Sequence, residues 1–416
     1  MKKAIVIFLA LSLLAAFGAF AAPNALRILH VAGPELDHLI ANLKDFEIAN
    51  NAKVSIDQTT REAMAERTMR ELIEQRGDYD VVLSLAGDDY TTFVYKGNYI
   101  PIEKYLSKQE VGQYWGRKVI TDPRTGLLAG IPQYHNSEML FYRKDLLQDP
   151  KEKAAFKKKY GRDLKVPKTL KELYEVAEFF TRPPNLYGYM VGGLEWSWWC
   201  DYQYFLFGQG QNVGDKDGNL TLNTPGAVKA MDYLAKIVKF NPPGWESQSF
   251  FDADAMMKAG KIFAYQNWSY IWKDFVTNMP DKIGIAAPVG DVEPGVYLSG
   301  WLALIPAKAE NPELAVKFLK WIGGFDYQKK IALDMLGNLP SRSDVLKNAE
   351  VRKAIPGVDQ FERTMSYGHV ARTTWKAEMS SAIYDAFFRV VKGEMSAKEA
   401  LDQLQNVKFA GRKAIE

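Results

Sequence analysis

Two hydrophobic periods alternate along the first third of the chain. Short apolar runs at residues 27–31, 54–56 and 79–84 predict buried strands, and the segments between them place apolar residues at helical spacing. The apolar faces of these two predicted helices are Leu36, Leu39, Ile40, Leu43 and Phe46, and Ala65, Met69, Leu72 and Ile73. This order predicts a mainly parallel sheet flanked by helices. Ligands bind such sheets at the carboxyl ends of strands, so residues 85–90 are a candidate binding loop.

A second α/β region begins after residue 130. Thr224-Pro225 and Asn311-Pro312 each place a cap residue and a proline before an amphipathic segment, which predicts two helix starts. The lysine-rich stretch at residues 145–167 is interpreted as a solvated insertion, and a helix is expected at residues 170–180. No low-complexity linker separates the two regions. Two lobes joined by strands that cross between them are therefore the predicted architecture.

The N-terminus has the pattern of a secretory signal peptide. Two lysines precede an apolar segment that is shorter than the roughly 20 residues of a membrane span, and Ala19-Phe20-Ala21 forms a cleavage pattern. We expect residues 1–21 to be removed near Ala21 and the mature protein to be soluble in the periplasm. A retained membrane anchor is the alternative. No cysteine lies near the cleavage point, so no lipid anchor is expected.

Composition and missing motifs narrow the function classes. The 53 basic residues nearly balance the 50 acidic ones, which argues against nucleic-acid binding. Cys200 is the single cysteine, and the four histidines have no metal-ligand spacing, so we expect no metal and no cofactor. Phosphate-loop, dinucleotide and serine-nucleophile motifs are missing. A secreted glycoside hydrolase stays an alternative, because a sequence does not give the distance between two carboxylates.

Aromatic residues carry the strongest chemical signal. Seven of the twelve residues from Trp196 to Phe207 are aromatic, and they would point around the whole circumference of a helix. Some are therefore expected to face a cleft or solvent. A second group of aromatic residues, Trp268 and Tyr270, lies beside amides at residues 266–270. Trp301 and Trp375 also have polar neighbours in the sequence. Aromatic faces stack on sugar rings while polar side chains bind hydroxyls, so the set favours a carbohydrate cleft.

Several motifs follow one another in an order typical of one family. They are Tyr79-Asp-Val-Val82 with Gly97-Asn-Tyr-Ile-Pro101, Gly130-Ile-Pro132 with Leu140-Phe-Tyr-Arg-Lys-Asp-Leu146, Pro167-Lys-Thr-Leu-Lys-Glu-Leu173, Gly260-Lys-Ile-Phe-Ala-Tyr-Gln-Asn-Trp268, Asn311-Pro-Glu-Leu-Ala315, Leu339-Pro-Ser-Arg-Ser343 and Lys392-Gly393 before Ser396-Ala-Lys-Glu-Ala-Leu401. Through them the whole mature chain resembles the extracellular solute-binding proteins of ABC importers, in the carbohydrate-binding group that includes maltose-binding protein.

The resemblance implies an α/β fold of two lobes with the ligand cleft between them. Residues 22–133 plus 303–350 would form the N-terminal lobe, and residues 134–302 plus 351–416 the C-terminal lobe. The lobes would close about strands near residues 130–134 and 298–303. A monomer that captures a carbohydrate and delivers it to an ABC permease is the implied function. A cyclitol, glycerol phosphate or polyamine stays an alternative ligand. For glycerol phosphate, Arg372 would bind the anionic phosphate.

Matching the motifs residue by residue, together with the aromatic cluster, gives the candidate ligand-binding residues. Either Asp88 or Asp89 would bind sugar hydroxyls, and Thr373 stands where the family has a proline after Arg372. The full candidate set is Asp88, Asp89, His135, Asn136, Glu138, Trp196, Trp199, Trp268, Tyr270, Gly300, Trp301, Arg372 and Trp375.

Overall fold

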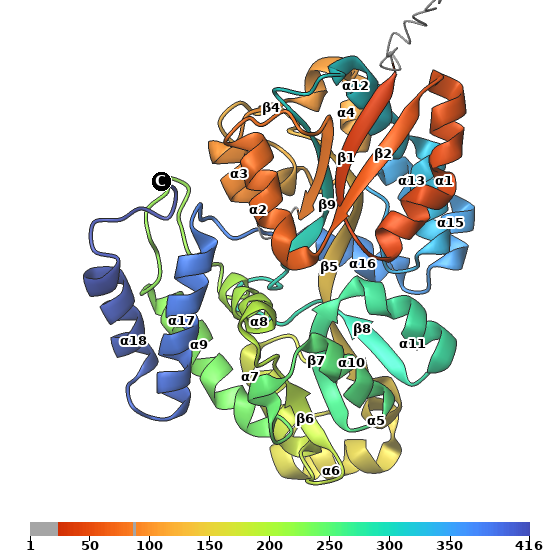
Figure 1. Cartoon of the computed structure of the whole chain (residues 1–416). Helices are drawn as coiled ribbons and strands as arrows, with labels where there is room; N and C mark the ends of the chain where they lie inside the picture. Colours follow the sequence, from red (N-terminus) through yellow and green to blue (C-terminus); the bar gives the residue numbers. More distant parts are fainter. Residues whose placement is uncertain (1–23, 86–88) are drawn as a thin grey trace, which may run out of the picture.

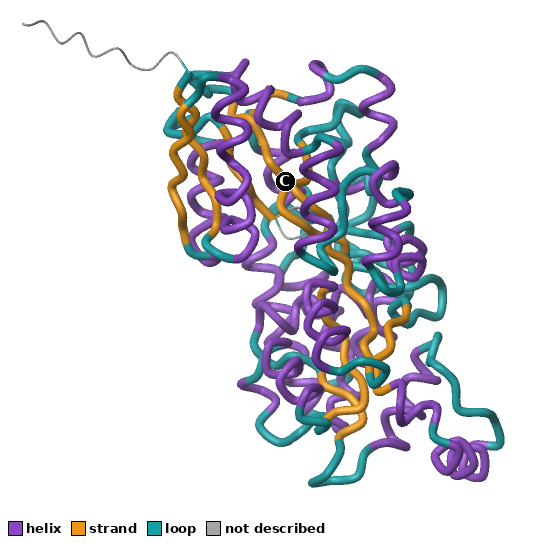
Figure 2. The backbone as a smooth tube through the Cα atoms, turned by 90° about the vertical axis from the view of Figure 1, so that its right-hand side faces the viewer, coloured by secondary structure: helices purple, strands orange, loops and turns teal. Residues whose placement is uncertain are grey.

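Two groups of strands and helices lie one above the other and are linked by two long strands (Figure 1). The computed structural model describes residues 24–85 and 89–416. The expected signal peptide and Asp88 lie outside the described residues. Strand β5 (Ile131–Arg143) runs from the first lobe into the second, and β9 (Leu298–Pro306) returns. Figure 2 shows these strands passing from one half of the molecule into the other.

The first lobe has an α/β core at the N-terminal end of the chain. Its strands are β1 (Ala25–Val31), β2 (Lys53–Thr59), β3 (Val81–Leu85) and β4 (Tyr99–Ile100). Its helices are α1 (Pro34–Asn50), α2 (Arg61–Leu72), α3 (Tyr90–Lys96), α4 (Lys108–Gln113), α12 (Pro312–Ile322), α13 (Phe325–Asp334), α14 (Ser343–Leu346) and α15 (Ala349–Ala354). The predicted strand–helix alternation before residue 85 is confirmed, although Ile40 of the expected apolar face is exposed.

The second lobe is built from the middle and the end of the chain. Its strands are β6 (Tyr187–Met190), β7 (Ile262–Trp268) and β8 (Ile283–Ala286). Its helices are α5 (Lys144–Gln148), α6 (Pro150–Tyr160), α7 (Leu170–Phe180), α8 (Glu195–Phe207), α9 (Pro225–Ile237), α10 (Phe250–Lys258), α11 (Trp272–Asn278), α16 (Val358–Met365), α17 (Lys376–Val391) and α18 (Ala397–Gln403). The last two helices pack on α8 and α9 and complete this lobe.

One continuous sheet runs through both lobes. Its strand order is β2-β1-β3-β9-β5-β7-β6, and β1 is parallel to both β2 and β3, as β6 is to β7. The pairs that involve β5 or β9 are antiparallel. This follows from the connectivity, because the two strands cross between the lobes in opposite directions. The predicted two-lobe α/β fold is confirmed, with crossing strands at the expected residues.

Local capping accounts for several helix starts. The backbone N–H of Ala227 donates to the Thr224 hydroxyl at 3.2 Å, and Thr169 and Glu172 form a reciprocal capping box at the start of α7. Pro312 occupies the first turn of α12 as expected, but the Asn311 side chain makes no capping hydrogen bond. The proline therefore marks this helix start without the predicted cap.

The expectation that some aromatic residues of α8 face a cleft or solvent holds for Trp196 only. The side chains of Trp198, Trp199, Tyr202, Tyr204, Phe205 and Phe207 are all buried. Trp196 is the exception, with 46% of its surface exposed. Helix α8 lies inside the second lobe, packed against α9 and α17, so it has an apolar neighbour on nearly every side. A helix that is hydrophobic all round is typically buried, as α8 is here.

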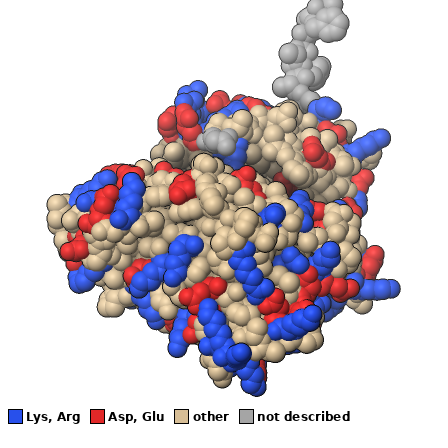
Figure 3. Space-filling model, turned by 90° about the horizontal axis from the view of Figure 1, so that it is seen from below, with Lys and Arg blue, Asp and Glu red and all other residues tan. Residues whose placement is uncertain are grey.

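Two features of the whole molecule bear on function. Within residues 24–85 and 89–416, no helix is long and apolar enough to cross a membrane. On the underside of the molecule, basic and acidic side chains are interspersed (Figure 3).

The expected lobe boundary at residue 350 falls inside α15, which packs on α13 and α14. We propose that the boundary lies after α15 and that the division is otherwise as expected.

Candidate functional site

Two adjoining cavities of about 630 Å³ each lie between the lobes. The hinge cavity borders the crossing strands, and the side cavity lies between α2, α3, α8 and the start of α17. Three residues line both cavities: Arg61, Phe250 and Phe251. Each cavity has the size of an ordinary small-molecule site, roughly 300–1,000 Å³. The cleft between the lobes therefore has two chambers.

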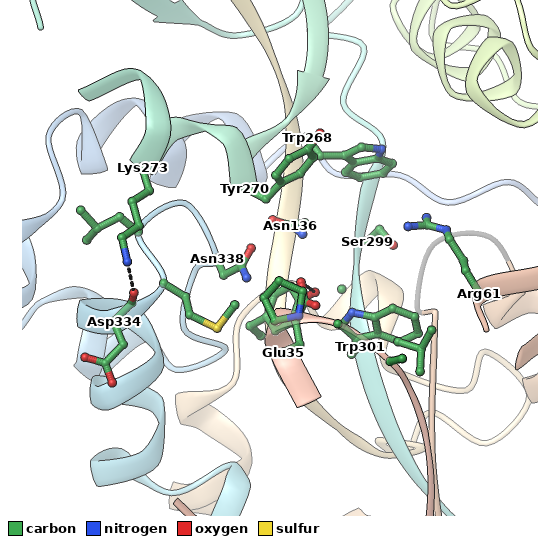
Figure 4. A pocket seen from close by; sticks show the side chains of 18 of the residues that line it. Glu35, Arg61, Asn136, Trp268, Tyr270, Lys273, Ser299, Trp301, Asp334 and Asn338 are labelled. Atoms are coloured by element: carbon green, nitrogen blue, oxygen red, sulfur yellow. Dashed lines mark hydrogen bonds between the residues drawn. The ribbon is translucent and has the colours of Figure 1, made fainter. Parts of the chain in front are cut away.

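Side chains from both lobes face one another across the hinge cavity (Figure 4). Trp268 ends β7 in the second lobe, and Tyr270 follows it in a short 3₁₀ turn (Ser269–Ile271). Trp301 comes from β9 on the opposite wall. Polar residues complete the lining between them: Glu35, Asn136, Ser299 and Asn338. This is a cavity with aromatic walls and a small set of hydrogen-bonding groups.

Gly300 sets the floor of the hinge cavity. Its φ is +152°, and a Cβ atom there would lie 2.1 Å from the carbonyl oxygen of Tyr134 on β5. The absence of a side chain therefore lets β9 approach β5 closely. Ser299 and Trp301 on either side of this glycine both reach the cavity wall.

A buried carboxylate holds Tyr270 in place. The Tyr270 hydroxyl donates to Asp254 Oδ2 at 2.7 Å, and Tyr265 and Asn267 donate to Oδ1. Burial raises the pKa of Asp254 to about 6, against the opposing effect of these three donors. The aromatic ring of Tyr270 thus reaches the cavity from a fixed position.

Charged residues of the hinge cavity differ in how they are engaged. Glu35 accepts a hydrogen bond from the Tyr134 hydroxyl at 3.0 Å. Lys273 of the second lobe donates to the backbone carbonyl of Asp334 in the first lobe at 2.7 Å (Figure 4). Arg61 has no ion pair or side-chain hydrogen bond with any group that the structure describes. It lies at the junction of the two chambers, where its guanidinium can donate to a bound molecule.

Two polar atoms in the wall of the hinge cavity lack a protein partner. Trp268 Nε1 and Asn338 Oδ1 are buried, and neither has a hydrogen-bond partner among the described residues. Buried polar groups are normally satisfied, so each would gain a partner if the cavity wall adjusted around a bound molecule or a water. One is a donor and the other an acceptor, as a polyhydroxylated ligand requires.

Eight of the thirteen predicted residues reach the cleft. Asn136, Trp268, Tyr270, Gly300 and Trp301 line the hinge cavity. Asp89, Trp196 and Trp375 line the side cavity. Trp375 presents only part of its ring to the cavity, because the Arg412 guanidinium lies 3.8 Å from the ring centroid. The indole Nε1 of Trp375 is also engaged, since it donates to the Lys413 carbonyl at 2.8 Å.

The structure places four predicted residues away from both cavities. His135 is buried against Trp115, whose carbonyl lies 3.1 Å from His135 Nε2, and burial lowers the pKa of His135 to about 4. Glu138 and Trp199 are buried inside the second lobe. Arg372 is exposed outside the cleft, where its backbone N–H donates to Asn212 Oδ1. Strand alternation accounts for His135, whose neighbour Asn136 points the opposite way, into the cavity.

Several lining residues were missed by sequence reasoning. Glu35 lies in the first turn of α1, directly after β1, and Arg61 begins α2, directly after β2. The rule that ligands bind at the carboxyl ends of strands would have found both. Phe250 and Phe251, at the start of α10, lay beside no recognised motif. Asn338 comes from a loop that folds back to pair with β5; the motif Leu339-Pro-Ser-Arg-Ser343 begins directly after it but does not include it.

Metal binding has no support in the described geometry. Among residues 24–85 and 89–416, no three His, Cys, Asp or Glu side chains are grouped so that they could hold a metal ion. The cleft offers aromatic faces, amides and hydroxyls instead. Its chemistry suits reversible binding of a polar organic solute.

Comparison with known families agrees with this geometry. The model of the bacterial extracellular solute-binding protein family matches residues 33–329, which is more than half of the chain. The chain belongs to this family. Its members are substrate-binding proteins of importers. Most of the site described above lies within the matched region; the lining residues outside it are Val31, Ala32, Asp334, Met335, Leu336, Asn338 and residues 374–378.

Relatives and solved structures extend the likeness. A probable ABC transporter-binding protein of Deinococcus radiodurans is 26% identical over 313 residues, which cover 72% of this chain and 71% of the relative. The solute-binding protein of Thermotoga lettingae with bound α-D-tagatose has a TM-score of 0.73 at 23% identity, covering 91% of this chain and 97% of that one. Maltose-bound MalE3 of T. maritima has a TM-score of 0.74 at 22% identity, with the same coverage. These two structures share the fold of this chain.

Proposed function

We propose that this extracellular solute-binding protein is the sugar-binding component of an ABC-type importer. It captures a carbohydrate between its lobes and delivers it to a membrane permease. The observation that carries the proposal is the hinge cavity, where Trp268 and Tyr270 of the second lobe face Trp301 on the crossing strand β9. Aromatic faces suit the C–H faces of sugar rings, and the polar groups between them suit hydroxyls.

The likeness to known binding proteins supports a sugar over other solutes. Two proteins of the same fold were solved with tagatose and with maltose, respectively. A polyamine would require several free carboxylates, but Glu35 accepts from Tyr134 and Asp334 accepts from His38 at 3.2 Å. The glycerol phosphate alternative relied on Arg372, which lines neither cavity.

Ligand-induced stabilisation tests the proposal. The mature protein is screened by thermal unfolding against monosaccharides, polyols and short oligosaccharides, and the molecule that co-purifies with it is identified by mass spectrometry. A bound sugar should raise the melting temperature in a concentration-dependent way, because binding to the folded state alone stabilises it. Stabilisation by amino acids or polyamines but by no carbohydrate would contradict the proposal.

Binding without turnover distinguishes this function from glycoside hydrolysis. A binding protein returns its sugar unchanged, so the ligand recovered after long incubation should have its original mass. A hydrolysed product would favour a secreted glycosidase instead.

Export and assembly state belong to the same proposal. We propose that residues 1–21 are removed, that the mature protein begins near Ala22 without a lipid, and that it is a periplasmic monomer that binds no nucleic acid. The intact mass of protein secreted by its own host checks the first two statements. A mass that includes the leader or an acyl group would contradict them.

A further inference from the structure

A row of aromatic rings connects the two chambers of the cleft. Trp196 lies 5.0 Å from Phe250 between ring centroids, Phe250 lies 4.7 Å from Phe251, and Phe251 lies 6.1 Å from Tyr270. Trp196 lines only the side cavity, Tyr270 lines only the hinge cavity, and the two phenylalanines line both. The row therefore runs without interruption from one chamber into the other.

The row is open to solvent where a ligand would lie on it. Trp196 is 46% exposed and Phe251 is 53% exposed, although each has large apolar neighbours. Exposed aromatic surface of this extent in a cleft is typical of a binding surface. Apolar side chains of α2 face it from the first lobe, namely Ala65 and Met69.

The two chambers differ in the chemistry they offer. The hinge cavity has the unpartnered Trp268 Nε1 and Asn338 Oδ1, the fixed ring of Tyr270 and the polar side chains of Asn136 and Glu35. Besides Arg61 at the junction, the charged residues of the side cavity are Asp89, Lys376 and Glu378, and Glu378 accepts from Arg412 at 2.7 Å. Oriented hydrogen bonds discriminate between sugars strongly, whereas stacking on an aromatic face tolerates changes in hydroxyl configuration.

We propose that the ligand is a linear oligosaccharide rather than a single sugar unit. This inference rests on the proposed function. The terminal unit enters the hinge cavity, where hydrogen bonds select its identity. The following units lie along the aromatic row in the side cavity, and they add affinity with little selection among stereoisomers. Arg61, which lines both chambers at their junction, donates to the oxygens between the first and second units.

Calorimetric titration of three homologous series tests the inference: glucose to maltotetraose, arabinose to arabinotetraose and xylose to xylotetraose. In the series that binds, affinity should rise by about tenfold or more between one unit and two or three units. Trp196→Ala should remove this gain with a much smaller effect on the single unit, because Trp196 lines only the side cavity. Tyr105→Ala is the matched control, because Tyr105 is an equally exposed aromatic residue outside both cavities.

The possible outcomes separate the two proposals. A single unit that binds as tightly as its longer homologues would overturn the oligosaccharide inference and leave the sugar-binding function intact. Equal losses for all chain lengths in Trp196→Ala would do the same, because the residue would then belong to the first subsite. If no member of the three series and no tagatose or polyol binds, the proposed function fails and this inference fails with it.

Discussion

Trp199 and Trp268 are both buried, at 1% and 7% exposure, yet only Trp268 lines a cavity. Trp268→Ala should weaken sugar binding by about ten- to a thousandfold, because it removes a stacking face from the hinge cavity. Trp199→Ala should instead cost about 3–5 kcal/mol of folding stability, because it leaves a void in the second lobe. Melting temperatures with and without saturating ligand measure both effects.

The pair is informative because each variant is the other's control. Trp199→Ala should keep its full ligand-induced shift in melting temperature despite a lower starting value. A Trp268→Ala variant with an unchanged ligand-induced shift would show that this ring only supports the wall.

Asp201 gives the second lobe a pH-dependent stability. Its carboxylate is buried, with one hydrogen bond at 3.0 Å from the Gly192 N–H, and burial raises its pKa to about 8. Between about pH 4 and pH 8 the folded protein holds this proton more tightly than the unfolded chain does. Folding stability should therefore fall as pH rises through that window, by up to about 1.4 kcal/mol per pH unit.

The variant Asp201→Asn removes this titration and keeps the acceptor oxygen. Relative to the unmodified protein, the variant should gain folding stability between pH 5 and pH 8 in chemical denaturation. Asp281→Asn, at an almost fully exposed side chain, is the control and should show the same small difference at both pH values. If the difference in folding stability between Asp201→Asn and the unmodified protein did not change with pH, solvent would have to reach this carboxylate.

Individual site residues were predictable only where chemistry and sequence neighbours agreed. Trp268 and Tyr270 lie beside amides, and Trp301 follows a glycine, so both aromatic walls of the hinge cavity were identified. Trp199 was predicted to bind the ligand but lies in the core, because its helix is surrounded by the rest of the second lobe. A sequence does not show such surroundings. Arg61 was missed because a single exposed arginine carries no pattern.

At the scale of elements, the close approach of β9 to β5 depends on Gly300. Gly300→Ala places a methyl group against the Tyr134 carbonyl and occupies a backbone conformation that side chains disfavour. We expect a loss of at least about 2 kcal/mol in folding stability, measured by chemical denaturation. Gly112→Ala in α4 is the control, since its added methyl group meets no atom within 4 Å. Comparable stabilities for the two variants would contradict the tight crossing.

Periodicity predicted the elements from β1 to β3, and cap and proline signals predicted the starts of α7, α9 and α12. The crossing strands followed from the lack of a linker. The loop that carries Asn338 was not predictable, because it is held by paired backbone hydrogen bonds between Leu339 and His135, far apart in sequence. Such contacts depend on the finished fold.

The whole molecule should change shape when it binds. Two antiparallel strands form the joint, and the cleft that they floor is open enough to hold two chambers. Small-angle scattering should therefore show a smaller radius of gyration with saturating sugar, as the lobes close about residues 130–134 and 298–303. An unchanged radius at saturation would indicate a rigid cleft.

The strand order also determines when each lobe can fold during synthesis. β3 gains its central neighbour only when β9 is made, because Leu85 pairs with Trp301. The second lobe waits equally long, since α17 and α18 near the C-terminus cover α8 and α9. A nascent chain emerges from its N-terminus onward, so neither core can close until nearly all of the polypeptide has been translated. We propose that the chain is exported. This delay would keep it unfolded long enough to pass through a translocation channel.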